Sequence, residues 1–266
     1  MKQKQLQLSA IKHLMQEYTR HKLEALEPIS LAEMDNVKLM NRTDTKCIFS
    51  VDLLNQLLDE FSSHYRVLFH AGTRAAYYRT LYFDTPELKF YKDHHNGREK
   101  RFKLRIRNYV ESNLNYLEIK HKRYGRTDKK RIITEPFAGN FGVDEERFIY
   151  GLLEERMVLK PVMWNNFHRI TLVNKFLPER VTIDLDLTFE QGDKRVSFNR
   201  LIIGEIKQER VNYNSPILNL LKKSGVRPSG MSKYCLGIAV LQEGVKKNTF
   251  KERILSIKKI EQNIHG

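Results

Sequence analysis

The chain has 266 residues, of which 41% are apolar, and its 47 lysines and arginines exceed its 32 acidic residues to give a net charge of +15. This length, this apolar content and the 26 phenylalanine and tyrosine residues exclude a disordered chain. Two cysteines are too few for a disulfide framework and favour a reducing cytosol, and no segment approaches the roughly 18 consecutive apolar residues of a membrane span. The positive charge predicts a polyanionic partner, and charge alone leaves open nucleic acid, a membrane surface or a phosphate-rich small molecule.

The first predicted element is an amphipathic helix over residues 1–25, in which apolar residues from Leu8 to Tyr18 recur at helical spacing. Ser50 is a suitable N-cap for a second helix, and Pro216 opens another that ends near Gly225. Two more helices are predicted over residues 144–153 and 250–260. No helix carries a catalytic pattern, so all of them are expected to pack against the rest of the fold.

The predicted strands carry most of the functional information, because each has one apolar and one charged face. On residues 101–107, the cations Arg101, Lys103, Arg105 and Arg107 alternate with apolar residues. Successive side chains of a strand point to opposite faces, so this alternation is typical of a strand. The same pattern predicts strands over residues 116–122, 180–187 and 202–207, and composition predicts one over residues 77–84.

Two sheet architectures accommodate these charged faces. An open antiparallel sheet would turn its charged face to water. A sheet that closes on itself would instead enclose the charged faces in a polar tunnel, which a phosphate chain and a divalent cation would neutralise. The four cations in a row on residues 101–107 favour the second architecture. No repeat or linker divides the chain, so we expect one domain over residues 1–266.

Eight short motifs lie on or beside the predicted strands. They are NRTDTK (41–46), LYFDT (81–85), KLRIR (103–107), LEIK (117–120), NFHR (166–169), RVTID (180–184), GEIK (204–207) and SKY (232–234). In this order they resemble the VTC domain, the polyphosphate polymerase domain of the CYTH-like triphosphate tunnel metalloenzyme superfamily, in its bacterial single-domain form. The resemblance covers about residues 40–240, with helices 1–25 and 249–262 as additions.

The resemblance implies a fold, a chemistry and a set of site residues. The implied fold is α+β, a closed antiparallel eight-stranded β-barrel tunnel with a charged interior and helices packed outside and at both chain ends. The implied substrates are ATP and inorganic polyphosphate, with Mn²⁺ or Mg²⁺ as cofactor. The resemblance assigns catalysis to Arg105, Arg107 and Lys120, metal binding to Glu205, and phosphate binding to Lys46, Lys103, Arg169, Arg180, Lys207 and Lys233.

The sequence also departs from the family pattern. One family arginine is Thr182 here, and a second family lysine is Gly230. The Glu-x-Glu-x-Lys opening of the triphosphatase branch begins with Arg42 and continues with Asp44 and Lys46. An arginine in place of the first carboxylate argues against a two-metal hydrolase site.

Three functions therefore follow from the sequence, with polyphosphate synthesis from ATP as the leading one. The alternatives are a triphosphatase or polyphosphatase on the same scaffold, and a non-catalytic module that binds polyphosphate or nucleic acid. Nucleic acid is the least favoured partner, because the basic face of residues 101–107 has no aromatic residue for base stacking. We expect a cytoplasmic protein, and the oligomeric state and a membrane partner stay open. The basic run 129–131 is interpreted as solvated.

Overall fold

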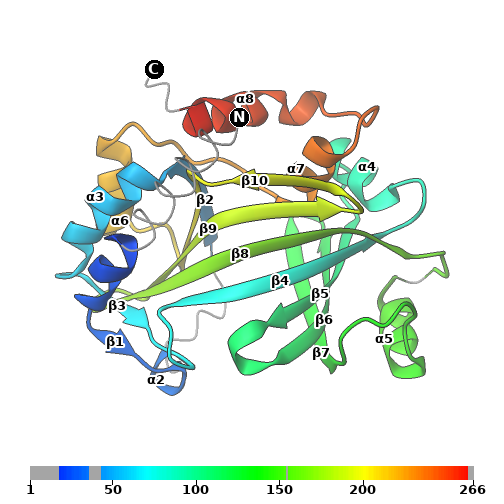
Figure 1. The fold of residues 1–266 in the computed structure, drawn as a ribbon, viewed down its shortest axis with the longest axis horizontal. Coiled ribbons are helices and arrows are strands. Elements are labelled where there is room, and N and C mark those ends of the chain that lie inside the picture. Colours follow the sequence, from blue (N-terminus) through cyan, green and yellow to red (C-terminus); the bar gives the residue numbers. More distant parts are fainter. Residues whose placement is uncertain (1–17, 36–42, 154, 263–266) are drawn as a thin grey trace.

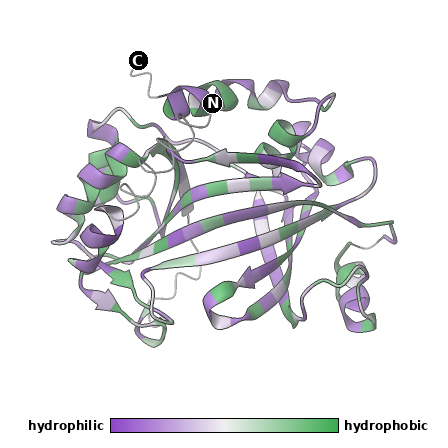
Figure 2. Cartoon of the chain, in the orientation of Figure 1, coloured by the Kyte–Doolittle hydropathy of each residue, from purple (hydrophilic) through white to green (hydrophobic). Residues whose placement is uncertain are grey.

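Eleven strands form one curved, mostly antiparallel sheet in the computed structural model, which describes residues 18–35, 43–153 and 155–262 (Figure 1). Figure 2 shows polar and apolar segments alternating along β8 and β9, as expected for strands with two unlike faces. The strands are β1 (Pro28–Ile29), β2 (Thr43–Ser50), β3 (Tyr65–Leu68), β4 (Ala75–Asp84), β5 (Arg101–Tyr109), β6 (Leu114–Arg123), β7 (Arg126–Thr134), β8 (Lys160–Asn174), β9 (Glu179–Gln191), β10 (Lys194–Phe198) and β11 (Leu201–Gln208).

The sheet is open, so the prediction of a closed eight-stranded barrel is wrong, although the α+β class is right. The main path of the sheet runs β2-β11-β9-β8-β4-β5-β6-β7, and no ladder joins β2 to β7 in the described part of the chain. The outer edge of β2 is met by the loop before α7 (Lys233–Leu241), where the Ser229 N–H donates to the Lys46 carbonyl at 2.7 Å. The loop therefore bonds to the free edge of β2, the edge with which a strand closing the barrel would have to pair. β7 is a largely exposed edge strand rich in lysine and arginine, which disfavours further strand pairing.

The predicted helices form where expected, and three further helices were not predicted. Ser50 and Ser215 cap α3 and α6 through their side chains, which accept the backbone N–H groups of Leu53 and Leu218. Residues 18–24 are helical, and the rest of the helix predicted over residues 1–25 lies outside the described residues. No helix in residues 18–35, 43–153 and 155–262 is long and apolar enough to cross a membrane. The helices are α2 (Leu31–Asp35), α3 (Val51–Phe61), α4 (Lys89–His95), α5 (Val143–Leu153), α6 (Pro216–Lys223), α7 and α8 (Lys251–Gln262), with 3₁₀ turns at Val110–Ser112 and Asn248–Phe250.

Helices cover both faces of the sheet, and α7 is the one that packs inside its curve (Figure 1). On the outer face, α3 and α6 bury apolar residues against β11 and β9, while α5 packs on β6 and β7. On the concave face, Tyr234 of α7 stacks on Tyr82, and Gly237 lies against Met163 and Phe189. A Cβ at Gly237 would lie only 2.6 Å from the Phe189 ring, so glycine lets α7 approach the sheet closely.

One extra residue in β9 changes which side chains face the concave side. Between the pairs His168–Leu185 and Asn166–Thr188, two steps along β8 oppose three steps along β9. Asp186 lies in this bulge with a φ of 54°, a left-handed conformation that is uncommon for a residue other than glycine. The alternation predicted through residues 180–187 therefore stops at Asp186, and that residue leaves the charged strand face.

Candidate functional site on the concave face

Arg105 and Arg107, the two predicted catalytic arginines, are almost fully buried on the concave face of β5. Arg105 donates from Nε to Glu118 Oε2 on β6 at 2.7 Å, and its Nη2 lies 2.6 Å from the same oxygen. Arg107 Nε lies 3.4 Å from the Thr80 hydroxyl of β4. Burial alone would lower the pKa of Arg105, but Glu118 and Tyr82 together outweigh burial and raise it. A charged guanidinium is therefore retained inside the fold.

β7 contributes Lys129, a lysine that the sequence interpretation assigned to a solvated run. Its ammonium group pairs with Glu118, the same fully buried carboxylate that holds Arg105. Burial lowers the pKa of Lys129 to about 8, although Glu118 opposes the shift. Thr127, Lys129 and Arg131 do alternate with other residues, but both faces of this strand are largely polar. The usual amphipathic signal was therefore missing.

A second ion-pair group joins β8, β9 and the first residue of α7. Arg169 forms a bidentate pair with Asp184, at 2.6 Å from Nε to Oδ1 and 2.8 Å from Nη2 to Oδ2. Lys233 reaches the same carboxylate from the start of α7, whose N-cap is Ser232. Burial alone would raise the pKa of Asp184, but Arg169 and Lys233 lower it to about 2. Burial also lowers the pKa of Lys233 to about 8, against the pull of Asp184.

The third group contains Glu205, the predicted metal ligand, at the β2–β11 end of the sheet. Glu205 is paired in register with Lys46, whose Nζ lies 2.9 Å from Oε1. Lys207 Nζ lies 2.5 Å from the other Glu205 oxygen and 3.8 Å from Asp44 Oδ2. Burial would raise the pKa of Glu205, but Lys207 and Lys46 hold it well below its usual range.

Curvature of the sheet combines these groups into one site. Burial and Arg105 lower the pKa of Lys120 on β6, and Glu205 on distant β11 is close enough to oppose them. The charge of Lys46 on β2 likewise helps to lower the pKa of Lys103 on β5. We call this site the charged face. In the described part of the chain it gathers nine cations, Lys46, Lys103, Arg105, Arg107, Lys120, Lys129, Arg169, Lys207 and Lys233, and four carboxylates, Asp44, Glu118, Asp184 and Glu205.

Aromatic rings from β4 and β8 support the guanidinium groups of the charged face. Arg107 and Arg169 lie 5.5 and 5.3 Å from the centroid of Tyr78, and Arg105 lies 6.0 Å from that of Tyr82. Tyr82 is 3% exposed and Phe167, which packs on Tyr78, is 0% exposed. Tyr82 and Phe167 therefore present almost no free surface on which a base could stack, whereas Tyr78 is half-buried.

The oxygen groups around Glu205 fit a small divalent cation that is bound together with phosphate. No group of three or more His, Cys, Asp or Glu side chains in the described ranges could hold a metal by itself. The register pairs Glu205 with Thr182, whose buried hydroxyl has no hydrogen-bond partner among the residues that the structure describes, and Asp44 lies diagonally across on β2. Mg²⁺ and Mn²⁺ prefer such oxygen ligands, take few of them from protein, and complete their shells with water and phosphate.

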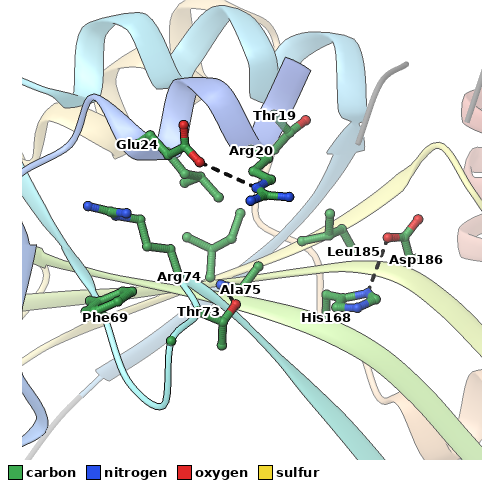
Figure 3. Close-up of a pocket in the computed structure, with 13 residues that line it drawn as sticks. Thr19, Arg20, Glu24, Phe69, Thr73, Arg74, Ala75, His168, Leu185 and Asp186 are labelled. Atoms are coloured by element: carbon green, nitrogen blue, oxygen red, sulfur yellow. Dashed lines mark hydrogen bonds and ion pairs between the residues drawn. The ribbon is translucent and has the colours of Figure 1, made fainter. Parts of the chain in front are cut away.

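Two polar residues of β9, Arg180 and Asp186, contact other parts of the fold. Arg180, a predicted phosphate ligand, donates from Nη2 to the Met34 carbonyl at 3.1 Å and so links β9 to α2. Asp186 pairs with His168 at 3.4 Å and lines a separate cavity of about 500 Å³, next to the helical residues 18–24 (Figure 3). The side chains of Asp186 and His168 point toward each other there.

The fold and the charged face together define an α+β protein with a concave, mostly basic site suited to anions. The chain belongs to the VTC domain family, whose pattern it matches over residues 41–242. The comparison with curated proteins found no match.

Three solved structures are similar to this chain at low identity. A candidate adenylate cyclase from Bacillus halodurans has 13% identity and a TM-score of 0.48, covering 77% of this chain and 100% of that one. A candidate adenylyl cyclase from Hippeastrum, described as having a dominant triphosphatase activity, has 15% identity, a TM-score of 0.46 and coverage of 77% and 98%. A protein from Pyrococcus horikoshii OT3 has 13% identity, a TM-score of 0.42 and coverage of 75% and 98%.

Proposed function

We propose that this protein transfers the γ-phosphate of ATP to a growing inorganic polyphosphate chain on the charged face, with Mg²⁺ or Mn²⁺. Membership of the VTC domain family supports a function that concerns triphosphate or polyphosphate. The observation that carries the proposal is the imbalance of charge within the fold, where nine cations are gathered with four carboxylates. Uncompensated buried charge is costly, so the free protein favours binding of a polyanion.

Phosphoryl transfer requires positioning and charge neutralisation more than covalent chemistry from the protein. A terminal oxygen of polyphosphate forms a bond to the γ-phosphorus of ATP while the bond to the β–γ bridging oxygen breaks, and ADP leaves. Arg105 and Arg107 offer planar donors to the oxygens of the transferring group, and Lys120 adds a point charge beside them. No side-chain nucleophile is needed, because the acceptor phosphate supplies the attacking oxygen.

The other cations hold the two substrates in line. Lys46 and Lys207 are bound to Glu205 in the free protein, and phosphate oxygens can replace the carboxylate on both lysines. Glu205 would then be available, with Asp44, to hold a divalent ion on the phosphates. When bound, that ion supplies further neutralisation of phosphate charge. Arg169 and Lys233 are held by Asp184 and extend the row of cations toward α7.

Turnover of ATP in the presence of Mn²⁺ tests the proposal when both free phosphate and long-chain polyphosphate are assayed. We expect polyphosphate from the wild type and a loss of about 10²-fold or more in Arg105→Ala and Glu205→Ala. Arg147→Ala is the matched control, because Arg147 is an exposed arginine of α5 that pairs only at the surface with Asp144. Circular dichroism of each variant confirms that the fold is retained.

Other results would change the assignment. Free phosphate without polymer would contradict the polymerase and show a hydrolase on the same scaffold. Binding of polyphosphate without any turnover would leave a binding module. Equal loss in Arg147→Ala and Arg105→Ala would show that the charged face is not the site.

A further inference from the structure

Arg107 is the one arginine of the charged face that forms no ion pair with the residues that the structure describes. Arg105 is held by Glu118 and Arg169 by Asp184, whereas Arg107 has only the Thr80 hydroxyl at 3.4 Å from its Nε. That distance is long for a hydrogen bond. Burial and the charges of Arg105 and Arg169 lower the pKa of Arg107, so its charge is not compensated by the groups around it. Another contact must therefore keep Arg107 beside the other cations.

Tyr78 lies on β4, between the strand that carries Arg107 and the strand that carries Arg169. The register places Tyr78 opposite Tyr109 on β5 and Phe167 on β8, and each arginine is two residues away from the partner on its strand. Alternate residues of a strand share a face, so the Tyr78 ring and both guanidinium groups lie on the concave face. The guanidinium carbons of Arg107 and Arg169 lie 5.5 and 5.3 Å from the centroid of this ring. Both distances are typical of cation–π interactions.

The Tyr78 ring is itself packed between two other rings. Phe167 stacks on it almost in parallel, with centroids 5.3 Å apart and an angle of 6°, and Tyr109 packs against it at 4.9 Å. Phe167 also lies 5.8 and 5.4 Å from the guanidinium groups of Arg107 and Arg169. Tyr78 and Phe167 thus form one aromatic platform beneath both arginines. Tyr78 is the half-buried member, whereas Phe167 is fully buried in the core.

We propose that Tyr78 is a positioning residue that holds Arg107 and Arg169 side by side so that both bind the same phosphate group, an inference that rests on the proposed function. The negative face of the ring attracts both guanidinium groups and offsets their mutual repulsion. Their N–H groups keep the planar arrangement that matches phosphate oxygens. Because the two side chains are held in place before phosphate arrives, less conformational entropy is lost on binding.

Calorimetric titration with inorganic tripolyphosphate and Mg²⁺ tests this role without requiring turnover. Tyr78→Leu removes the ring and should weaken tripolyphosphate binding about tenfold, equivalent to ~1.4 kcal/mol. Tyr78→Phe keeps the ring and removes only the hydroxyl, so it should bind as the wild type does. Tyr150→Leu is the matched control, because Tyr150 is a half-buried tyrosine of α5 whose ring lies 5.7 Å from Arg156, away from the charged face. Tyr78→Met, which also removes the ring, repeats the test if the leucine variant does not fold.

A double-mutant cycle separates positioning from a general effect on the fold. In an Arg107→Gln background the ring holds only Arg169, so Tyr78→Leu should weaken binding by about threefold instead of tenfold. The same factor in both backgrounds would show that the ring does not act through Arg107 and would overturn the inference.

Three other results would also decide against the role of the ring. A Tyr78→Leu variant that binds as tightly as Tyr150→Leu would show that the platform is not needed. Equal losses in Tyr78→Phe and Tyr78→Leu would assign the effect to the hydroxyl. If the wild type does not bind tripolyphosphate at all, the proposed function fails, and the inference fails with it, whereas normal binding by the wild type and by Tyr78→Leu refutes the inference alone.

Discussion

Replacing Glu118 with glutamine should lower the stability of the free protein and raise its affinity for polyanions. Glu118 is 0% exposed and pairs with both Arg105, at 2.6 Å, and Lys129. Glutamine keeps the shape of the side chain and removes its charge, so the buried Arg105 and the partly exposed Lys129 lose their counter-charge. Removing one partner of a buried ion pair typically costs about 3–5 kcal/mol. Coulomb's law for unit charges about 4 Å apart, at an effective dielectric constant of about 20, independently gives ~4 kcal/mol.

Urea unfolding at neutral pH measures this loss, and repeating it with tripolyphosphate measures the rescue. We expect Glu118→Gln to lose about 3–5 kcal/mol of unfolding free energy without ligand. Tripolyphosphate should raise the unfolding free energy of this variant by more than it raises that of the wild type. Asp144→Asn is the control, because Asp144 forms an exposed pair with Arg147 on α5 and should show neither effect. A Glu118→Gln variant as stable as this control, or one that tripolyphosphate stabilises no more than wild type, would refute the reasoning.

Two further predictions concern pH and packing. Burial lowers the pKa of Lys129 and of Lys233 to about 8, below the usual 10.5. Between these two pH values the folded state binds fewer protons than the unfolded state, so the free energy of unfolding should rise with pH. The affinity for tripolyphosphate should fall as the pH passes 8, because the two lysines lose their charge. Urea unfolding and tripolyphosphate titration at about pH 7, 8 and 9 test both trends. A free energy of unfolding and an affinity that stay constant across this range would contradict the prediction. Gly237→Ala should cost about 1–3 kcal/mol in urea unfolding, because the new methyl group meets Met163, whereas Gly151→Ala on α5 meets nothing within 4 Å and should stabilise by about 0.5–1 kcal/mol. Equal effects of the two alanines would contradict the packing argument.

Local features of the fold were predictable because they depend on neighbouring residues. The cap at Ser50, the start of a helix at Pro216 and the charged alternation of β5 follow from short-range chemistry, and the structure confirms them. Helix α7 was not predicted from the sequence. Its residues KYCLGIAVL are buried nearly all round, so they lack the one-sided pattern by which helices are recognised.

Long-range features were not predictable from pattern alone. The edge of β2 bonds to Ser229, which lies 183 residues from Lys46 in sequence, and no local pattern predicts such a contact. Similarly, Lys129 shares a strand with exposed cations, and only the pairing of β7 with β6 brings it to Glu118. All the predicted cations except Arg180, together with Glu205, lie on the charged face, and their roles in binding phosphate and metal stay predictions. Lys129 was not predicted, because its strand has no apolar face.

The bulge at Asp186 determines which side chains of β9 face the concave side of the sheet. Upstream of it, even-numbered residues such as Asp184 face Arg169, while downstream the odd-numbered Phe189 faces α7. One strand thereby supplies the carboxylate that pairs with Lys233 and the apolar side chain on which the helix carrying Lys233 packs. Deleting Asp186 would shift one half of the strand by a single step, turning Phe189 outward and a polar neighbour toward α7. A single residue in the left-handed conformation thus keeps the charged and apolar halves of the concave surface in register.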